Sequence, residues 1–232
     1  MKNTPLQKWG GAAAIYEALA YIMGMVGFIM VVNISEITDP LQKVAAIAAN
    51  QGLLSLLQLG VYILWGGMLV VLSLALHERL RGESSALVRT ATAFGLIWAG
   101  LVMASGMIYS VGMEKVVTLN ANDPALAATV WLTIESVANA IGGDVEIVGG
   151  VWVLLLSAAA LRNGGLPRAF SFFGLLVGAA GAITLVPALA EAGAMAFGVT
   201  QIIWFAWLGI ALLSSRPQPQ AGKAKVYVAP TA

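Results

Sequence analysis

Long uncharged apolar stretches alternate with short polar segments along this chain. Several stretches run for about 20 residues, the length that an α-helix needs to cross a hydrocarbon core about 30 Å thick. The pattern predicts an all-α fold, a polytopic membrane helical bundle of six transmembrane helices that forms one domain over residues 1–213. The predicted spans cover residues 11–32, 51–76, 88–111, 141–161, 170–189 and 194–213.

The polar connections also carry local signals. Residues 41–49 follow the turn-forming pair Asp39-Pro40 and are expected to form a short interfacial helix. We expect residues 77–85, which include His77, to form a solvated loop, and residues 162–168 to form a tight hairpin around their glycines and proline. Residues 214–232, rich in Pro, Gln and Ala, are expected to be a disordered cytoplasmic tail.

The distribution of Lys and Arg predicts the orientation of the bundle. If the N-terminus lies inside the cell, the inner segments hold ten of the twelve basic residues, and only Lys43 and Lys115 lie outside. Because cytoplasmic segments carry an excess of Lys and Arg, this imbalance places both termini in the cytoplasm.

The segment 122–162 is the most unusual part of the sequence. We expect it to be one helix of about 35 residues, in which the span 141–161 follows a helical extension over 124–140; such a helix would exceed about 50 Å. Its first half carries Glu135, Asn139, Asp144 and Glu146, whereas 147–161 holds no charge. Two alternatives follow: the acidic half projects from the bilayer as a solvated extension, or it lies inside and forms a site.

Polar side chains recur at helical spacing in the outer halves of the second and fourth spans. Since a carboxylate inside a membrane costs several kcal/mol unless it is paired, protonated or hydrated, we expect these groups to gather around one outward-facing polar pocket above an apolar floor. The candidate ligand-binding residues are Gln51, Gln58, Tyr62, Glu135, Asn139, Asp144 and Glu146. Glu17, in the inner half of the first span, is a further candidate buried acid, with Tyr16, Tyr21 or another helix as its partner.

Composition excludes several kinds of chemistry. With 59% hydrophobic and 10% charged residues, the chain is unlike a soluble globular domain. It has no cysteine and one histidine, so disulfides, thiolate metal sites and multi-histidine sites are excluded, and we expect no metal site and no cofactor. Met103 and Met107 share a helix face, but methionine is also an ordinary packing residue. A net charge of +1 without a basic patch argues against nucleic acid.

Glycines within the predicted spans indicate close helix contacts. Gly174, Gly178 and Gly181 lie on one face of the fifth span, and glycine pairs at 66–67 and 149–150 lie within the second and fourth. Small residues allow the backbone approach on which helix packing in lipid depends.

The turn Leu166-Pro167-Arg168, followed by Gly174 and Gly178, and the pair Trp207-Leu208 in the last span carry a family resemblance. With these motifs the chain resembles an uncharacterised bacterial family of six-helix integral membrane proteins, a domain of unknown function. The resemblance implies the six-helix layout and the bacterial inner (plasma) membrane, and it implies no activity.

Two functional hypotheses remain open from the sequence. In the first, this multi-pass protein binds, and in a stronger version transports, a small cation, an amine or an amphipathic ligand in the outward-facing pocket. In the second, it is a non-catalytic accessory or assembly subunit of a larger membrane complex. The sequence favours a non-enzymatic role, although acid–base chemistry by the acidic residues stays open.

Overall fold

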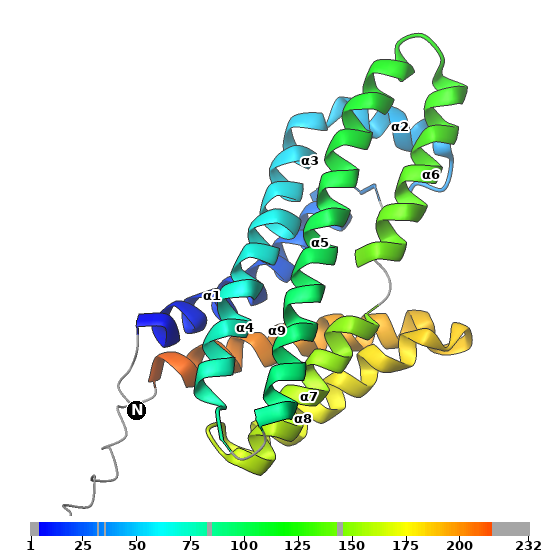
Figure 1. Cartoon of the computed structure of the whole chain (residues 1–232). Helices are drawn as coiled ribbons and strands as arrows, with labels where there is room; N and C mark the ends of the chain where they lie inside the picture. The colour runs from blue at the N-terminus through cyan, green and yellow to red at the C-terminus, as the bar shows by residue number, and fades with distance from the viewer. Residues whose placement is uncertain (1–4, 32, 35, 83–84, 143–145, 215–232) are drawn as a thin grey trace, which may run out of the picture.

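The computed structural model describes residues 5–31, 33–34, 36–82, 85–142 and 146–214. Every regular element in these ranges is a helix (Figure 1). Six helical stretches are long and apolar enough to cross a membrane, which confirms the all-α class and the six-helix layout. They are Pro5–Phe28, Gln51–Arg79, Ala86–Asn120, Pro124–Asn163, Arg168–Leu185 and Pro187–Ser214.

The elements follow one another with short connections. α1 (Pro5–Met25) continues into the π-helical turn η1 (Val26–Val31). Three further elements follow one another directly: α3 (Gln51–Gln58), the π-helical turn η2 (Leu59–Leu64) and α4 (Trp65–Arg79). The remaining elements are α2 (Pro40–Ala49), α5 (Ser85–Asn120), α6 (Pro124–Gly142), α7 (Ile147–Asn163), α8 (Arg168–Ala182), η3 (Ile183–Leu185), η4 (Pro187–Leu189) and α9 (Ala190–Ser214).

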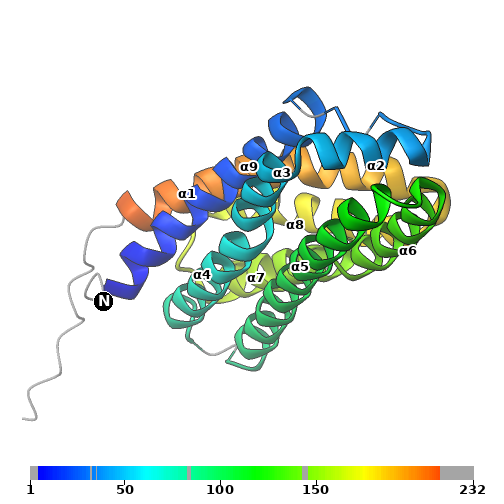
Figure 2. The same ribbon diagram turned by 90° about the horizontal axis from the view of Figure 1, so that it is seen from above.

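The short helix expected at 41–49 is present as α2. The Asp39 side chain caps it by accepting a hydrogen bond from the backbone N–H of Leu41 at 2.9 Å, and Pro40 occupies the first turn, where its missing N–H costs nothing. Val44 and Ile47 are buried against α5 and α6, and α2 therefore covers one end of the α5–α6 hairpin (Figure 2).

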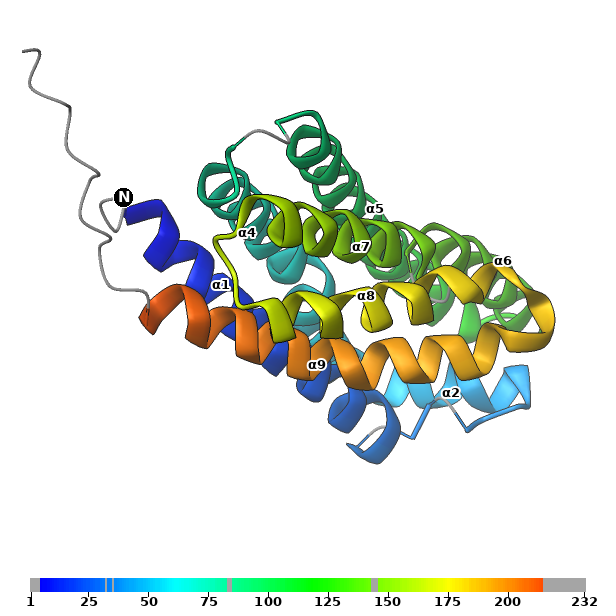
Figure 3. The same cartoon turned by 90° about the horizontal axis from the view of Figure 1, so that it is seen from below.

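The helices pack through small residues. α1 runs antiparallel to α9, and the two ends of the described chain meet where the Gln7 side-chain amide donates to the Leu212 carbonyl at 3.2 Å (Figure 3). α7 and α8 approach closely at Gly150, where an added methyl group would lie 2.8 Å from the Gly178 carbonyl oxygen. These contacts explain the glycines that the sequence placed on the fifth span.

The segment 122–162 is two helices rather than the one that the sequence predicted. α6 ends at Gly142, and Glu146 precedes α7 with φ −85° and ψ 12°. α6 packs along α5, whereas α7 packs chiefly against α8 and α5, and the axes of α6 and α7 differ in direction (Figure 1). Residues 143–145, between these helices, lie outside the described residues, and the apolar periodicity of the sequence continues on both sides of them.

His77 lies in the last turn of α4 and not in a solvated loop, because α4 continues to Arg79. Its Nδ1 lies 2.8 Å from the Thr92 hydroxyl of α5. The expected hairpin after α7 is present, with positive φ of 74° at Gly164 and 91° at Gly165. The Arg79 guanidinium donates to the Gly165 carbonyl at 2.8 Å and joins this hairpin to the end of α4.

Two clusters of buried residues hold the bundle together. The larger one has an aromatic centre in which Trp98 lies 4.8 Å from Trp65 and 5.6 Å from Trp152, measured between ring centroids, and Trp152 lies 5.5 Å from Trp204. The smaller cluster, which includes Trp131, lies beneath α2. Two polar side chains are also fully buried in the bundle: Glu17, which the sequence singled out as a candidate buried acid, and Gln201.

Candidate functional site

A pocket of about 480 Å³ lies between α2, the α3–η2 segment, α5 and α6. Its lining combines apolar side chains with a group of polar and aromatic ones. These are Lys43, Gln58, Tyr62, Tyr109, Trp131, Glu135 and Asn139. A hollow with a few polar groups among apolar side chains is typical of small-molecule sites.

An ion pair connects α2 to α6 at the edge of this pocket. The Lys43 ammonium lies 3.1 Å from Glu135 Oε1 and 3.3 Å from Oε2. The two side chains are 16% and 26% exposed, so the pair is only partly open to solvent. Lys43 and Glu135 are the charged side chains in the described lining, and their charges balance.

Polar contacts fix the remaining wall. The Tyr109 hydroxyl donates a short hydrogen bond to Asn139 Oδ1, and the Ser110 hydroxyl donates to Gln58 Oε1 at 3.1 Å. The Tyr109 ring lies 5.8 Å from Tyr62 and 5.8 Å from Trp131, which gives the pocket three neighbouring aromatic walls.

The Trp131 indole supplies a donor that the described residues do not use. Its side chain is 4% exposed, and its Nε1 has no hydrogen-bond partner within the described part of the chain. A buried N–H without a partner costs about 1–3 kcal/mol. The Nε1 atom itself is buried, so the Trp131 ring contributes its apolar surface to the pocket.

A second cavity of about 340 Å³ adjoins the first. Phe28 and Tyr62 line both cavities, and these two residues lie on the π-helical turns η1 and η2. Single π-helical turns occur frequently at functional sites. Glu146 lines the second cavity and not the first.

The structure brings together only part of the residue set that the sequence proposed. Gln58, Tyr62, Glu135 and Asn139 line the first pocket, whereas Gln51 does not. Asp144 lies outside the described residues. Glu146 is separated from Glu135 because the helix that was expected to carry both is divided between α6 and α7.

The stripe from Gln51 to Tyr62 also divides, for a geometric reason. Gln58 is buried and Tyr62 half-buried, while Ser55 faces outward and its hydroxyl donates to the Gln51 carbonyl at 2.9 Å. Gln51, Ser55 and Gln58 all lie in α3, and this segment borders the pocket only from Leu54 onward, through Leu54, Gln58 and Tyr62.

Sequence reasoning missed Lys43, Tyr109 and Trp131 as pocket residues. All three lie on segments that the sequence identified, but their shared wall depends on α2 folding across the α5–α6 hairpin. The one available signal was Lys43, a basic residue on a short helix otherwise dominated by apolar residues.

Glu17 is a fully buried acid at the middle of α1. Neither carboxyl oxygen has a hydrogen-bond partner among the described residues. Tyr16 does not fill this role, because its hydroxyl donates to the Gly60 carbonyl at 2.8 Å. Glu17 lies outside both cavities.

In the described ranges no group of three or more His, Cys, Asp or Glu side chains could hold a metal ion. Comparisons with protein-family models, with curated proteins and with solved structures gave no match. The function must therefore be inferred from the six-helix bundle and the two cavities described above, and the resemblance to a bacterial six-helix family stays a prediction.

Proposed function

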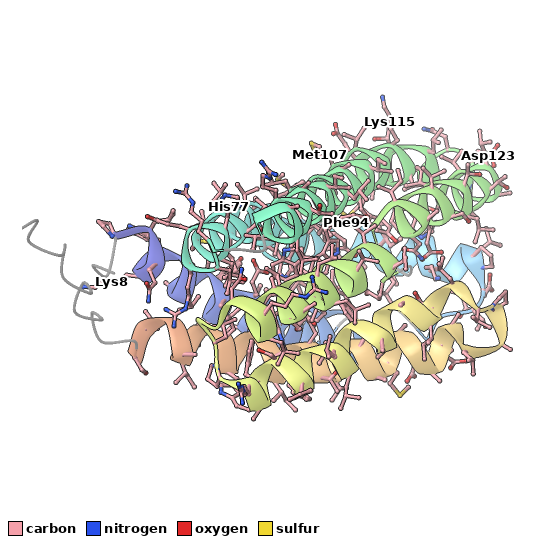
Figure 4. All side chains as sticks on the ribbon, turned by 60° about the horizontal axis from the view of Figure 1, so that its bottom comes forward. Lys8, His77, Phe94, Met107, Lys115 and Asp123 are labelled. Atoms are coloured by element: carbon pink, nitrogen blue, oxygen red, sulfur yellow. The ribbon has the colours of Figure 1, made fainter. Side chains whose placement is uncertain are left out.

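We propose that this chain is a multi-pass protein of a bacterial inner membrane, with its first pocket facing outward. The six apolar helical stretches support insertion. Arg79, Arg162 and Arg168 lie at the end of the bundle where the chain termini meet, and Lys8 and His77 lie there too, far from Asp123 (Figure 4). This distribution of basic residues favours a cytoplasmic location for that end.

We further propose that the pocket between α2, α3, α5 and α6 binds a small amphipathic amine that also carries a hydrogen-bond acceptor. The balanced pair Lys43–Glu135 carries this proposal, because it offers a partner to each half of such a ligand. The ligand ammonium would bind Glu135, and its acceptor group would bind Lys43. The aromatic walls would cover its apolar part.

A bare metal cation fits this pocket less well. Among the described lining residues Glu135 is the one carboxylate. Calcium takes six to eight oxygen ligands and magnesium demands near-octahedral geometry. An organic ammonium needs only one carboxylate and a few further contacts.

The test compares three probes of similar size: 2-phenylethylamine, phenylalanine as a zwitterion, and the neutral 3-phenyl-1-propanol. We expect isothermal titration calorimetry in detergent to show binding of the two amines and much weaker binding of the alcohol. Charge-assisted hydrogen bonds contribute about 1.5–3 kcal/mol, so Glu135→Gln should weaken amine binding by about ten-fold or more.

Glu114→Gln is the matched control, because Glu114 is an exposed acid on α5 outside the pocket. Its amine affinity should equal that of the parent protein. Equal affinity for all three probes, or unchanged amine binding in a folded Glu135→Gln protein, would overturn the proposal.

A further inference from the structure

The second cavity has a lining of a different chemical character. Three of its aromatic rings meet edge to face: Tyr21 and Trp65 lie 6.1 Å apart with an interplanar angle of 72°, and Trp65 and Trp98 lie 4.8 Å apart at 76°. Trp65 and Trp98 are 3% and 4% exposed, so the lining rings that stay partly accessible are those of Tyr21, Phe28 and Tyr62. The negative faces of aromatic rings attract cations within about 6 Å.

Glu146 is the one charged side chain in the described lining of this cavity, and it is an acid. It precedes the first turn of α7, beside the site where α7 and α8 pack through glycine. The remaining lining is dominated by aromatic and aliphatic residues of α1, η2, α5 and α9. A carboxylate next to several aromatic faces in an otherwise apolar space suits a cation that has few hydrogen-bond donors of its own.

The cavity opens between α1 and α9. These helices are tightly packed at Gly209, where an added methyl group would lie 2.7 Å from Ile15. They are not packed in this way at Gly198, where an added methyl group would meet nothing within 4 Å. Figure 1 shows the two helices diverging from the end at which the termini meet. At the open side the lining residues Met25, Met195 and Val199 are 43%, 68% and 52% exposed.

We propose that this second cavity is a site for a trimethylammonium group, which enters laterally between α1 and α9. The ligand chemistry follows from the aromatic faces and Glu146. The apolar rim formed by Met25, Met195 and Val199 fits an approach from lipid. The group could belong to a small soluble cation or to the headgroup of a phosphatidylcholine lipid, and the experiment separates these sources.

The test uses choline and its neutral carbon isostere 3,3-dimethyl-1-butanol, titrated by calorimetry into the full-length protein in phosphatidylglycerol nanodiscs, with empty nanodiscs as the blank. We expect choline to bind at least ten-fold more tightly than the alcohol. Glu146→Gln should weaken choline binding by about ten-fold and leave the affinity for the alcohol unchanged. The exposed acid Glu191 on α9 provides the matched control Glu191→Gln, which should bind choline like the parent.

A second pair of variants tests the aromatic part independently of the charge. Tyr21→Phe keeps a ring and should preserve the preference for choline, whereas Tyr21→Leu should reduce it by about two- to thirty-fold. Equal binding of choline and the alcohol by the parent protein overturns the proposal, as does a Tyr21→Leu protein with the full preference for choline.

The lipid arm repeats the choline titration in phosphatidylcholine nanodiscs. A lower apparent choline affinity there identifies the lipid headgroup as the occupant, through competition. An unchanged affinity identifies a small cation. The two cavities share no charged lining residue. A failed test of this site therefore does not refute the proposal for the Lys43–Glu135 pocket, and the reverse also holds.

Discussion

The contact between α7 and α8 gives the sharpest test of the packing. Gly150 faces α8 at a position where an added methyl group would lie 2.8 Å from the Gly178 carbonyl oxygen, 2.8 Å from the Ala182 nitrogen and 2.9 Å from the Gly181 carbonyl carbon. All three atoms belong to the backbone, which cannot move aside as a flexible side chain can. Gly150→Ala therefore requires the two helices to separate.

The size of the effect follows from two opposing terms. Overpacking of a close-packed interface costs about 1–3 kcal/mol, and the higher helix propensity of alanine returns about 0.8–1 kcal/mol. The expected result is a net loss of about 0.5–2 kcal/mol in the free energy of unfolding. Gly67→Ala is the control, because Gly67 is exposed, lies within α4 and would meet nothing within 4 Å.

The assay is reversible unfolding by sodium dodecyl sulfate in mixed micelles, followed by circular dichroism, on the parent and both variants. Gly67→Ala should be as stable as the parent or more stable by up to about 1 kcal/mol. If Gly150→Ala unfolds at the same detergent fraction as Gly67→Ala, the close approach of α7 and α8 is wrong.

Three further outcomes can be measured by the same unfolding assay. Glu17→Leu should stabilise the protein by about 1–3 kcal/mol, because it removes a buried carboxyl group without a hydrogen-bond partner among the described residues; a loss of stability would show that Glu17 has a partner. Gly164→Ala should destabilise it by about 1–3 kcal/mol through backbone strain alone, since φ is 74° and no atom lies within 4 Å of the added methyl group; an unchanged stability would contradict this turn. A double-mutant cycle on Lys43→Gln and Glu135→Gln should give a coupling of about 0.5–1 kcal/mol that weakens at high salt, and a coupling of zero would argue against the ion pair.

Local signals in the sequence were sufficient for much of the fold. The apolar stretches, the Asp39-Pro40 start of α2 and the glycine turn after α7 depend on residues close together in the chain, so their patterns could be read directly. The main error over the segment 122–162 arose because the apolar periodicity of the sequence continues from α6 into α7, although the two helices point in different directions.

The candidate site was predictable only in part, because local signals identify polar residues but not contacts between segments far apart in the chain. Gln58, Tyr62, Glu135 and Asn139 were identified as polar residues in apolar stretches, and they do share a pocket. Lys43 could not be joined to Glu135 from the sequence, because 92 positions separate them and nothing local indicates that α2 lies across α6.

By itself the sequence determined that the chain forms apolar helices with polar connections and a marked imbalance of basic residues, because each of these properties is set by neighbouring residues and helical period. Only the tertiary structure decided that the polar residues divide between two cavities, since that depends on the end of α6, the π-helical turns and the divergence of α1 from α9. These features arise from contacts between distant segments, which the order of residues along one helix does not encode.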